Sequence, residues 1–135
     1  MSTGNAEVVR RLYAAMDDRD IATIMELAHP DAEWIPDPRV GEGPVRGREK
    51  VIAFFLDRAE MFGEVRTELE RLWERDDQVL AFIQVAGEGR ASGAGFDVRI
   101  AHLWTLRDGV LVRGQGFGNR REALEAIGLT EDGDS

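Results

Sequence analysis

The 135 residues carry 17 Lys and Arg against 26 Asp and Glu, which gives a formal net charge of -9, and they include no cysteine. Such a chain repels phosphate backbones, so nucleic acid is not expected as a partner, and disulfides and thiolate chemistry are excluded. Hydrophobic residues make up 43% and charged residues 32%, a globular balance that predicts one domain over residues 1–135 with an acidic tail at about 130–135.

Three helices and one short strand are predicted in the first half of the chain. Apolar residues recur at spacings of three and four over residues 6–16, which predicts a helix with one apolar stripe. Asp20 is a suitable N-cap for a second, short helix that ends before His29-Pro30. Residues 31–35 are predicted as a strand, followed by a Pro- and Gly-rich loop at the rim of a pocket. A third helix with a broad apolar face is predicted from residue 47 to about 62.

The second half of the chain changes to a period of two, which is typical of strands. Four neighbouring antiparallel strands are predicted at residues 65–71, 79–86, 96–106 and 110–117. Asp108-Gly109 marks a tight turn between the last two of them, and a final helix is predicted between the N-cap Asn119 and Gly128. Helices followed by an antiparallel sheet indicate an α+β domain, in which the helices pack on one face of a curved sheet.

Five segments of the chain resemble segments of a known family and follow one another in the same order. They include Leu12-Tyr13-Ala14-Ala15-Met16, His29-Pro30-Asp31-Ala32-Glu33-Trp34, Gly47-Arg48-Glu49, Ala101-His102-Leu103-Trp104 with the residues up to 109, and residues 119–129. Together they resemble the nuclear transport factor 2-like superfamily and, within it, the SnoaL-like, polyketide cyclase-like branch. The resemblance implies a cone-shaped α+β barrel whose N-terminal helices pack on a strongly curved, mainly antiparallel sheet that encloses a pocket. It leaves the function open, because the superfamily hosts ketosteroid isomerases, cyclases, epoxide hydrolases, dehydratases and proteins without catalysis.

His102 is the first candidate catalytic residue. It shares one strand face with Ile100 and Trp104, and its position resembles the one where SnoaL-like cyclases keep a pocket histidine. An imidazole there donates a hydrogen bond to a developing enolate or carries a proton. The alternative is a core histidine that is bonded within the protein.

The acid that accompanies this histidine in the family is missing. The resemblance places Gly116 where cyclases and epoxide hydrolases carry an aspartate, which argues against aldol cyclisation because the proton-abstracting base is absent. We expect the alternating glycines of this strand to widen the cavity. Epoxide hydrolysis is not expected either, because Phe82 and Gln84 stand at the positions of the family's Arg and first Asp. Gln84 is expected either to bind a ligand beside Phe82 or to be paired within the sheet.

Asp37 is the second candidate catalytic residue. An ungapped match to the isomerases puts Pro36 at the position of the base, whereas a one-residue insertion puts Asp37 there. If Asp37 faces the cavity, desolvation is expected to raise its pKa and suit it to act as a general base. The alternative is a plain turn residue between two prolines.

Aromatic residues complete the predicted site. Tyr13 lies close to the position of the isomerases' donor tyrosine, although the ungapped match gives Leu12, and core packing is the alternative. Trp34, Phe54 and Trp104 are predicted to form an apolar wall for a ligand, or else simply part of the core. No metal site and no cofactor are expected, because His29 and His102 are far apart in sequence and no acidic triplet is found.

These observations predict a small-molecule pocket protein, a cyclase, isomerase or dehydratase that acts by proton transfer on an apolar oxygenated substrate. The alternative is a non-catalytic ligand-binding or dimerisation module that uses the same cavity. A homodimer through the convex sheet face is expected, with Leu103 and Leu111 as its outward apolar residues. Because the sequence has no signal-peptide core and no spanning segment, we expect a cytoplasmic protein without membrane contact.

Overall fold

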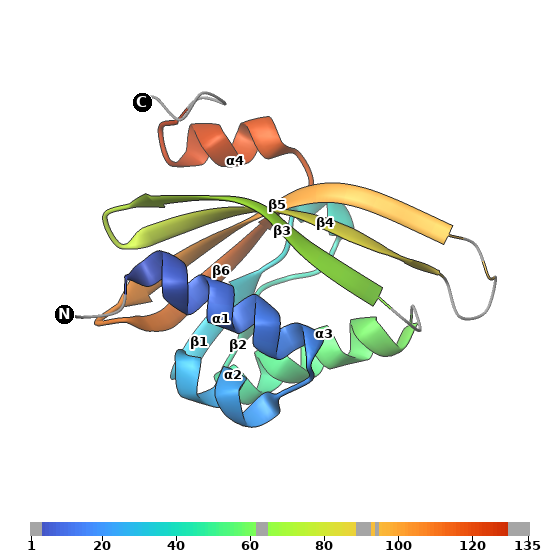
Figure 1. The fold of residues 1–135 in the computed structure, drawn as a ribbon, viewed down its shortest axis with the longest axis horizontal. Helices are drawn as coiled ribbons and strands as arrows, with labels where there is room; N and C mark the ends of the chain where they lie inside the picture. The colour runs from blue at the N-terminus through green and yellow to red at the C-terminus, as the bar shows by residue number, and fades with distance from the viewer. Residues whose placement is uncertain (1–3, 62–64, 89–92, 94, 130–135) are drawn as a thin grey trace.

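The computed structural model describes residues 4–61, 65–88, 93 and 95–129. Three helices lie on one side of a six-stranded sheet and a fourth lies on the other (Figure 1). The helices are α1 (Asn5–Asp17), α2 (Ile21–Leu27), α3 (Arg48–Met61) and α4 (Arg120–Ala126), with a short 3-10 helix η1 at Pro38–Val40. The strands are β1 (Ala28–Ile35), β2 (Val45–Arg46), β3 (Val65–Arg75), β4 (Gln78–Glu88), β5 (Gly95–Arg107) and β6 (Val110–Phe117).

The strands are ordered β2-β1-β6-β5-β4-β3 in the sheet. All neighbours pair antiparallel except β1 and β6, which are parallel because the chain crosses from one edge to the other between them. The sheet is mixed and does not close, since β2 and β3 remain its two edges. The prediction of a cone-shaped α+β fold with a mainly antiparallel sheet is confirmed, in the form of an open cone rather than a closed barrel.

Four of the predicted strands, β1, β3, β4 and β5, are longer in the structure. β1 begins at Ala28 rather than at residue 31, and a register shift between Ala28 and Glu33 leaves Pro30 outside the ladder with β6, which is how a strand accommodates proline. β3 runs on to Arg75 past an irregularity at Glu70. The predicted end of the third helix at 62 and the acidic tail at 130–135 lie outside the described residues.

The two faces of β5 face two different layers. Ile100, His102 and Trp104 face α1–α3, whereas Ala101 and Leu103 face α4. The core on the α1–α3 side combines the apolar stripe of α1 with residues of β1, β4, β5 and β6. Its buried members are Val8, Val9, Leu12, Tyr13, Leu27, Trp34, Val79, Ala81, Ile83, Trp104, Leu106 and Leu111.

The convex face of the sheet is covered by α4. Trp73, Leu80, Phe82, Ala101 and Leu103 pack there against residues of α4 and the segment after it, namely Ala123, Leu124 and Ile127. The outward positions predicted for two leucines were wrong: Leu103 lies under α4 and Leu111 lies in the opposite core, with 6% and 3% of their surfaces exposed. The homodimer stays a prediction, to be measured by sedimentation, and these leucines no longer support it.

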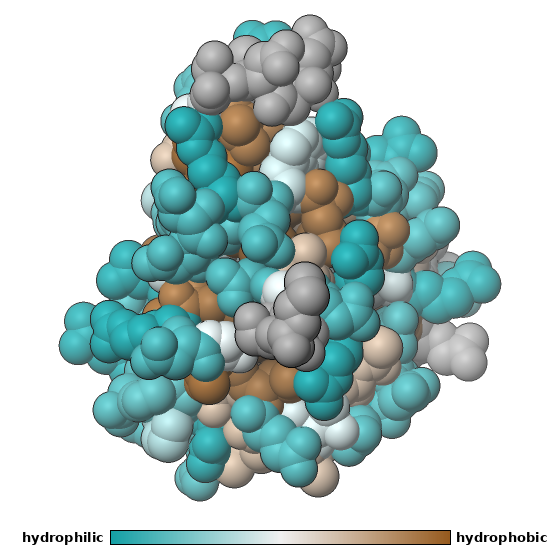
Figure 2. All heavy atoms as spheres, turned by 60° about the vertical axis from the view of Figure 1, so that its left-hand side comes forward, coloured by the Kyte–Doolittle hydropathy of each residue, from teal (hydrophilic) through white to brown (hydrophobic). Residues whose placement is uncertain are grey.

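The surface is mainly hydrophilic at the end of the molecule where the N-terminus lies. Figure 2 shows this end, with hydrophobic residues exposed in separate groups between hydrophilic ones. Among the helices of the described part of the chain, none is both long and apolar enough to cross a membrane. The apolar side chains are instead concentrated in the interior, between the helices and the sheet.

Candidate functional site

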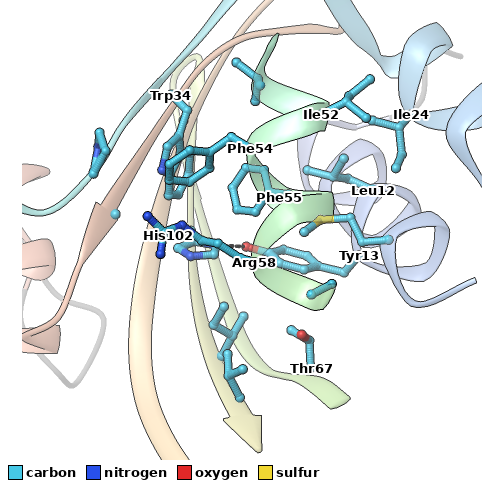
Figure 3. Close-up of a pocket in the computed structure, with 18 of the residues that line it drawn as sticks. Leu12, Tyr13, Ile24, Trp34, Ile52, Phe54, Phe55, Arg58, Thr67 and His102 are labelled. Atoms are coloured by element: carbon cyan, nitrogen blue, oxygen red, sulfur yellow. Dashed lines mark hydrogen bonds between the residues drawn. The ribbon is translucent and has the colours of Figure 1, made fainter. Parts of the chain in front are cut away.

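A cavity of about 800 Å³ lies between α1–α3 and the concave face of the sheet. Its walls are mostly aliphatic and aromatic, with a few polar groups among them (Figure 3). Such a composition is typical of small-molecule sites, in which a few polar groups orient an apolar ligand. The labelled side chains of Figure 3 include Leu12, Tyr13, Ile24, Trp34, Phe54, Phe55, Arg58 and His102.

His102 is held from one side by a hydrogen bond to α1. The hydroxyl oxygen of Tyr13 lies 2.8 Å from Nδ1 of His102, and both side chains point toward each other in Figure 3. The indole Nε1–H of Trp104 donates to the same hydroxyl oxygen at 2.9 Å. The hydroxyl hydrogen of Tyr13 needs an acceptor at this buried site, and Nδ1 of His102 is the acceptor within hydrogen-bond distance. We therefore assign the Tyr13 hydroxyl as the donor to Nδ1, which puts the imidazole's own proton on Nε2.

The Nε2–H group of His102 is available to a ligand. Among the described residues, no side chain or backbone group accepts a hydrogen bond from it. Nε2 of His102 is also not fully enclosed. Within that part of the chain, the fully buried side-chain atoms that lack a partner are Nε of Arg48 and Nε1 of Trp73. Since His102 lines the cavity, its free donor opens into it.

Burial keeps this pair of side chains neutral. Desolvation lowers the pKa of His102 from 6.5 to about 3, and it raises the pKa of Tyr13 above its ordinary value of 10.0 despite the hydrogen bond from Trp104. A buried base resists gaining a charge and a buried phenol resists losing its proton, for the same reason. At neutral pH His102 is therefore a hydrogen-bond donor and not a proton carrier.

Trp34 occupies the space beside His102. Its ring meets the imidazole edge-to-face at a centroid distance of 4.9 Å, and it contacts Phe55 and Trp104 at 4.9 and 5.5 Å. Phe54 packs edge-to-face on Phe55 at 5.5 Å. The predicted aromatic wall of Trp34, Phe54 and Trp104 therefore lines the cavity, while Trp34 and Trp104 also belong to the core.

Gly114 and Gly116 line the cavity as expected, but the space that they leave is taken largely by indole rings. A Cβ atom at Gly114 would lie 2.4 Å from Cζ3 of Trp104 and 2.7 Å from Cε3 of Trp34. A Cβ atom at Gly116, which is paired with His102 across the ladder, would lie 3.0 Å from Cζ2 of Trp34. The volume that the family's acid would need is thus filled by Trp34.

Asp37 lies at the edge of the cavity but its carboxylate is used by the fold. It accepts the backbone N–H of Gly118 at 2.7 Å and that of Arg39 at 2.9 Å, and it pairs with the Arg39 guanidinium, which also binds Glu122 of α4. These bonds, led by that from Gly118, lower the pKa of Asp37. The expected rise in its pKa was wrong, because Asp37 joins β1, η1 and the end of β6.

Phe82 and Gln84 are not in the cavity, so their predicted contact with a ligand there was wrong. Both lie on the face of β4 opposite to Ala81 and Ile83. Phe82 packs on Trp73 at a centroid distance of 4.6 Å and beneath the Arg120 guanidinium at 4.5 Å. Gln84 donates from Nε2 to the carboxylate of Asp97 at 2.8 Å, which is the alternative of pairing within the sheet.

Phe55, Arg58 and Asp17 are among the cavity-lining residues that were missed as site candidates. Phe55 and Arg58 come from the predicted third helix, where Arg58 stands four residues after Phe54 and so on the same face. Asp17, at the end of α1, lines the cavity as a solvent-exposed residue, and partial desolvation raises its pKa despite a hydrogen bond with the backbone of Thr67. Across the described part of the chain, no three His, Cys, Asp or Glu side chains are placed to hold a metal ion.

Comparison with known proteins places the chain in a family. A model of the SnoaL-like domain matches residues 9–114, and the chain belongs to the SnoaL-like family. This agrees with the open α+β cone of the structure.

Solved structures of this fold superpose over most of the chain. A putative SnoaL-like polyketide cyclase from Jannaschia sp. CCS1 is 23% identical, with a TM-score of 0.77 over 87% of this chain and 90% of its own. TerC, co-crystallised with polyporic acid, is 26% identical, with a TM-score of 0.76 over 92% of this chain and 98% of its own. IdmH, a putative polyketide cyclase from Streptomyces antibioticus, is 19% identical, with a TM-score of 0.76 over 94% of this chain and 100% of its own.

One curated protein of a different kind also matches part of the sequence. The ECF RNA polymerase sigma factor SigJ of Mycobacterium tuberculosis (strain ATCC 25618 / H37Rv) is 40% identical over 62 residues. The match covers 42% of this chain but 20% of the sigma factor, so it spans only a fifth of that protein's length.

Proposed function

We propose that this domain binds an apolar molecule with a carbonyl-type oxygen in its cavity, and that Nε2–H of His102 donates a hydrogen bond to that oxygen. The observation that carries the proposal is the bond from Tyr13 to Nδ1, which directs the remaining imidazole proton toward the cavity. Support comes from the apolar walls of the cavity and from TerC, whose structure contains polyporic acid.

The reaction class that this arrangement favours is enolisation, the step shared by isomerases, cyclases and dehydratases. A neutral imidazole that donates to a carbonyl oxygen stabilises the negative charge that develops there when a neighbouring C–H proton is removed. Inside an apolar cavity such a bond is stronger than in water. His102 would thus act as an electrophilic donor, and Asp17, a cavity-lining carboxylate with a raised pKa, is the candidate acceptor of the proton.

A second candidate function is ligand binding without turnover. Two observations favour it: Trp34 fills the place of the family's acid at Gly116, and Asp37 is engaged in backbone hydrogen bonds. The partial match to a sigma factor adds an example of a related sequence in a protein that is not named for an enzymatic activity.

Binding is tested with two naphthalenes of similar shape, 2-acetylnaphthalene and 2-isopropylnaphthalene. Quenching of the fluorescence of Trp34 and Trp104, which line the cavity, reports the affinity for each. We expect the ketone to bind about fivefold more tightly, the worth of one neutral hydrogen bond. The variant His102→Phe should bind both equally; a ketone preference that survives this substitution, or no binding of either compound, would contradict the proposal.

Turnover is tested by hydrogen–deuterium exchange. In D2O, enolisation of 2-acetylnaphthalene replaces its methyl protons with deuterium, which NMR measures without knowledge of the natural substrate. Under the first candidate function the wild-type protein accelerates exchange, and both His102→Phe and Asp17→Asn reduce the acceleration. Under the second, the ketone binds but its exchange rate stays at that of buffer.

A further inference from the structure

Arg58 places a positive charge at the boundary between the cavity and solvent. This residue of α3 lines the cavity, and 35% of its side chain is exposed, whereas His102 is only 6% exposed. Its guanidinium carbon lies 4.3 Å from the ring centre of Phe54, another residue of the aromatic wall. In Figure 3 the Arg58 side chain extends from α3 toward the sheet, on the same side of the cavity as His102.

The acid that pairs with Arg58 comes from outside the cavity walls. Glu42 belongs to the segment between η1 and β2, and 42% of its side chain is exposed. The two glycines that flank Glu42 border open space, since a Cβ atom added at Gly41 or Gly43 would meet nothing within 4 Å. An ion pair this exposed contributes little to stability because water screens it. Glu42 can therefore leave Arg58 and return to solvent at a small cost.

Two other arginines of the cavity wall are engaged by the protein itself. Nη1 of Arg48 donates to the backbone carbonyls of Met25 and Ala28, at 3.0 and 3.3 Å, which fixes the guanidinium within the protein although its buried Nε has no partner among the described residues. Nε of Arg113 donates to Glu33 at 2.8 Å, and only 17% of the Glu33 side chain is exposed. Arg58 differs from both, because its partner is a solvent-exposed carboxylate that a ligand can replace.

We propose that Arg58 binds a carboxylate of the ligand at the mouth of the cavity, in exchange for Glu42. Resting on the proposed function, this names the ligand class: an apolar molecule that presents an acceptor oxygen to His102 and a carboxylate to Arg58. The planar guanidinium suits this role because its N–H groups match the two oxygens of a carboxylate. The stacking of Arg58 on Phe54 holds the guanidinium beside the apolar body of such a ligand.

The test compares 2-naphthoic acid, which is ionised at neutral pH, with the neutral 2-naphthamide by calorimetric titration. We expect the wild-type protein to bind the naphthoate about tenfold more tightly than the amide, in line with a charge-assisted hydrogen bond. Arg58→Gln should abolish this preference and leave the amide affinity within about twofold. Glu42→Gln removes the internal competitor, so it should strengthen naphthoate binding about threefold and leave amide binding unchanged.

Arg19→Gln provides the matched control, because Arg19 also lines the cavity but lies in the turn after α1. The preference for naphthoate should persist in this variant, and its loss there would overturn the assignment to Arg58. Equal affinity for both compounds in the wild-type protein, or weaker naphthoate binding in Glu42→Gln, would also overturn it while leaving the proposed function intact. Failure of both compounds to bind would contradict the proposed function itself.

Discussion

The hydroxyl of Tyr13 and Nδ1 of His102 lie 2.8 Å apart although 89 positions separate the two residues in the chain. Their rings are nearly parallel, with an interplanar angle of 14° and a centroid distance of 6.0 Å. The orientation of the site histidine on β5 is therefore set by the first helix, and it depends on how the apolar stripe of α1 packs on the sheet.

Replacing Tyr13 by Phe should remove the hydrogen bond that fixes the tautomer of His102. The substitution keeps the ring but leaves Nδ1 of His102 and Nε1 of Trp104 without their shared partner. We expect both imidazole tautomers to become populated, and a loss of about 1–3 kcal/mol in the free energy of unfolding for the unpaired buried groups. Nitrogen-15 NMR of the imidazole measures the tautomer, and urea unfolding measures the stability. A single Nε2–H tautomer in Tyr13→Phe would refute the role given to this hydroxyl.

The low pKa of His102 predicts how stability depends on pH. The folded protein keeps the imidazole neutral down to about pH 3, whereas the unfolded chain protonates it below its ordinary pKa of 6.5. Between these values the unfolded state binds more protons, so stability falls as the pH falls, with a limiting slope of about 1.4 kcal/mol per pH unit.

In the range from pH 6.5 to about 4 Asp37, with its lowered pKa, keeps its contribution to stability. Asp17, whose pKa is raised, titrates there with the opposite sign, but it does so equally in the wild-type protein and in a His102 variant, so the difference between the two isolates His102. Urea unfolding across that range should show a steep slope for the wild-type protein and a shallower one for His102→Gln, whose side chain does not titrate. Equal slopes for the two proteins would mean that His102 is protonated in the folded state.

Gly114 should tolerate no side chain. A Cβ atom at this position would lie within 2.8 Å of three indole carbons of Trp34 and Trp104, so Gly114→Ala should destabilise the protein by about 1–3 kcal/mol through overpacking. Gly43→Ala serves as the control, since a Cβ atom there meets nothing within 4 Å, and its effect should stay within about 0.5 kcal/mol. Thermal unfolding of both variants checks the difference, and equal stability would show that the two indole rings can shift apart.

How far the sequence predicts this molecule depends on whether its patterns distinguish the two sides of the sheet. Alternation along β5 was enough to place His102 and Trp104 on one face, and helical spacing was enough to find α1 and α3. In β4, however, both faces are apolar, because one packs on the helices of the cone and the other beneath α4. A period of two then states which residues share a face but not which face lines the cavity. The placement of Phe82 in the cavity, which came from the resemblance to the family, therefore found no correction in the pattern.

The contact between Trp34 and Gly116 could not be predicted from the sequence for a different reason. These residues come from β1 and β6, which pair in parallel although most of the chain lies between them. Nothing in the order of residues shows that an indole fills the space left by a glycine so distant in sequence. The glycine pattern was visible and its consequence was not, because that depends on how one side chain is oriented in three dimensions.

Asp37 should prove to be a structural residue. Asp37→Ala removes the acceptor of the Gly118 and Arg39 N–H groups, and we expect a loss of about 1–2 kcal/mol in the free energy of unfolding. The wild-type contribution exists at pH values above the ordinary carboxyl pKa of 3.8 and disappears as the pH falls through the lowered pKa of Asp37. The rate of deuterium exchange into 2-acetylnaphthalene should be the same in Asp37→Ala as in the wild-type protein, when measured well below the unfolding temperature. A strong loss of exchange in Asp37→Asn with unchanged stability would restore Asp37 as the base.

The family's acid should be restorable only if Trp34 is made smaller. Gly116→Asp alone forces a side chain against Cζ2 of Trp34 and should be strongly destabilising. In Trp34→Val/Gly116→Asp the carboxylate gains that space, so the double variant should be more stable than the sum of the single changes predicts, by about 0.5–3 kcal/mol.

Because residue 116 is paired with His102 across the ladder, the new carboxylate should also raise the pKa of His102 from its value of about 3, as a neighbouring negative charge favours the imidazolium. NMR titration of the imidazole in the double variant and in Trp34→Val separates this effect from the loss of the indole. If the two variants titrate alike, residue 116 does not face His102. A raised pKa of His102 together with faster deuterium exchange into 2-acetylnaphthalene would support one conclusion. The presence of an indole in place of the acid would then be the change that separates this protein's chemistry from that of the family's cyclases.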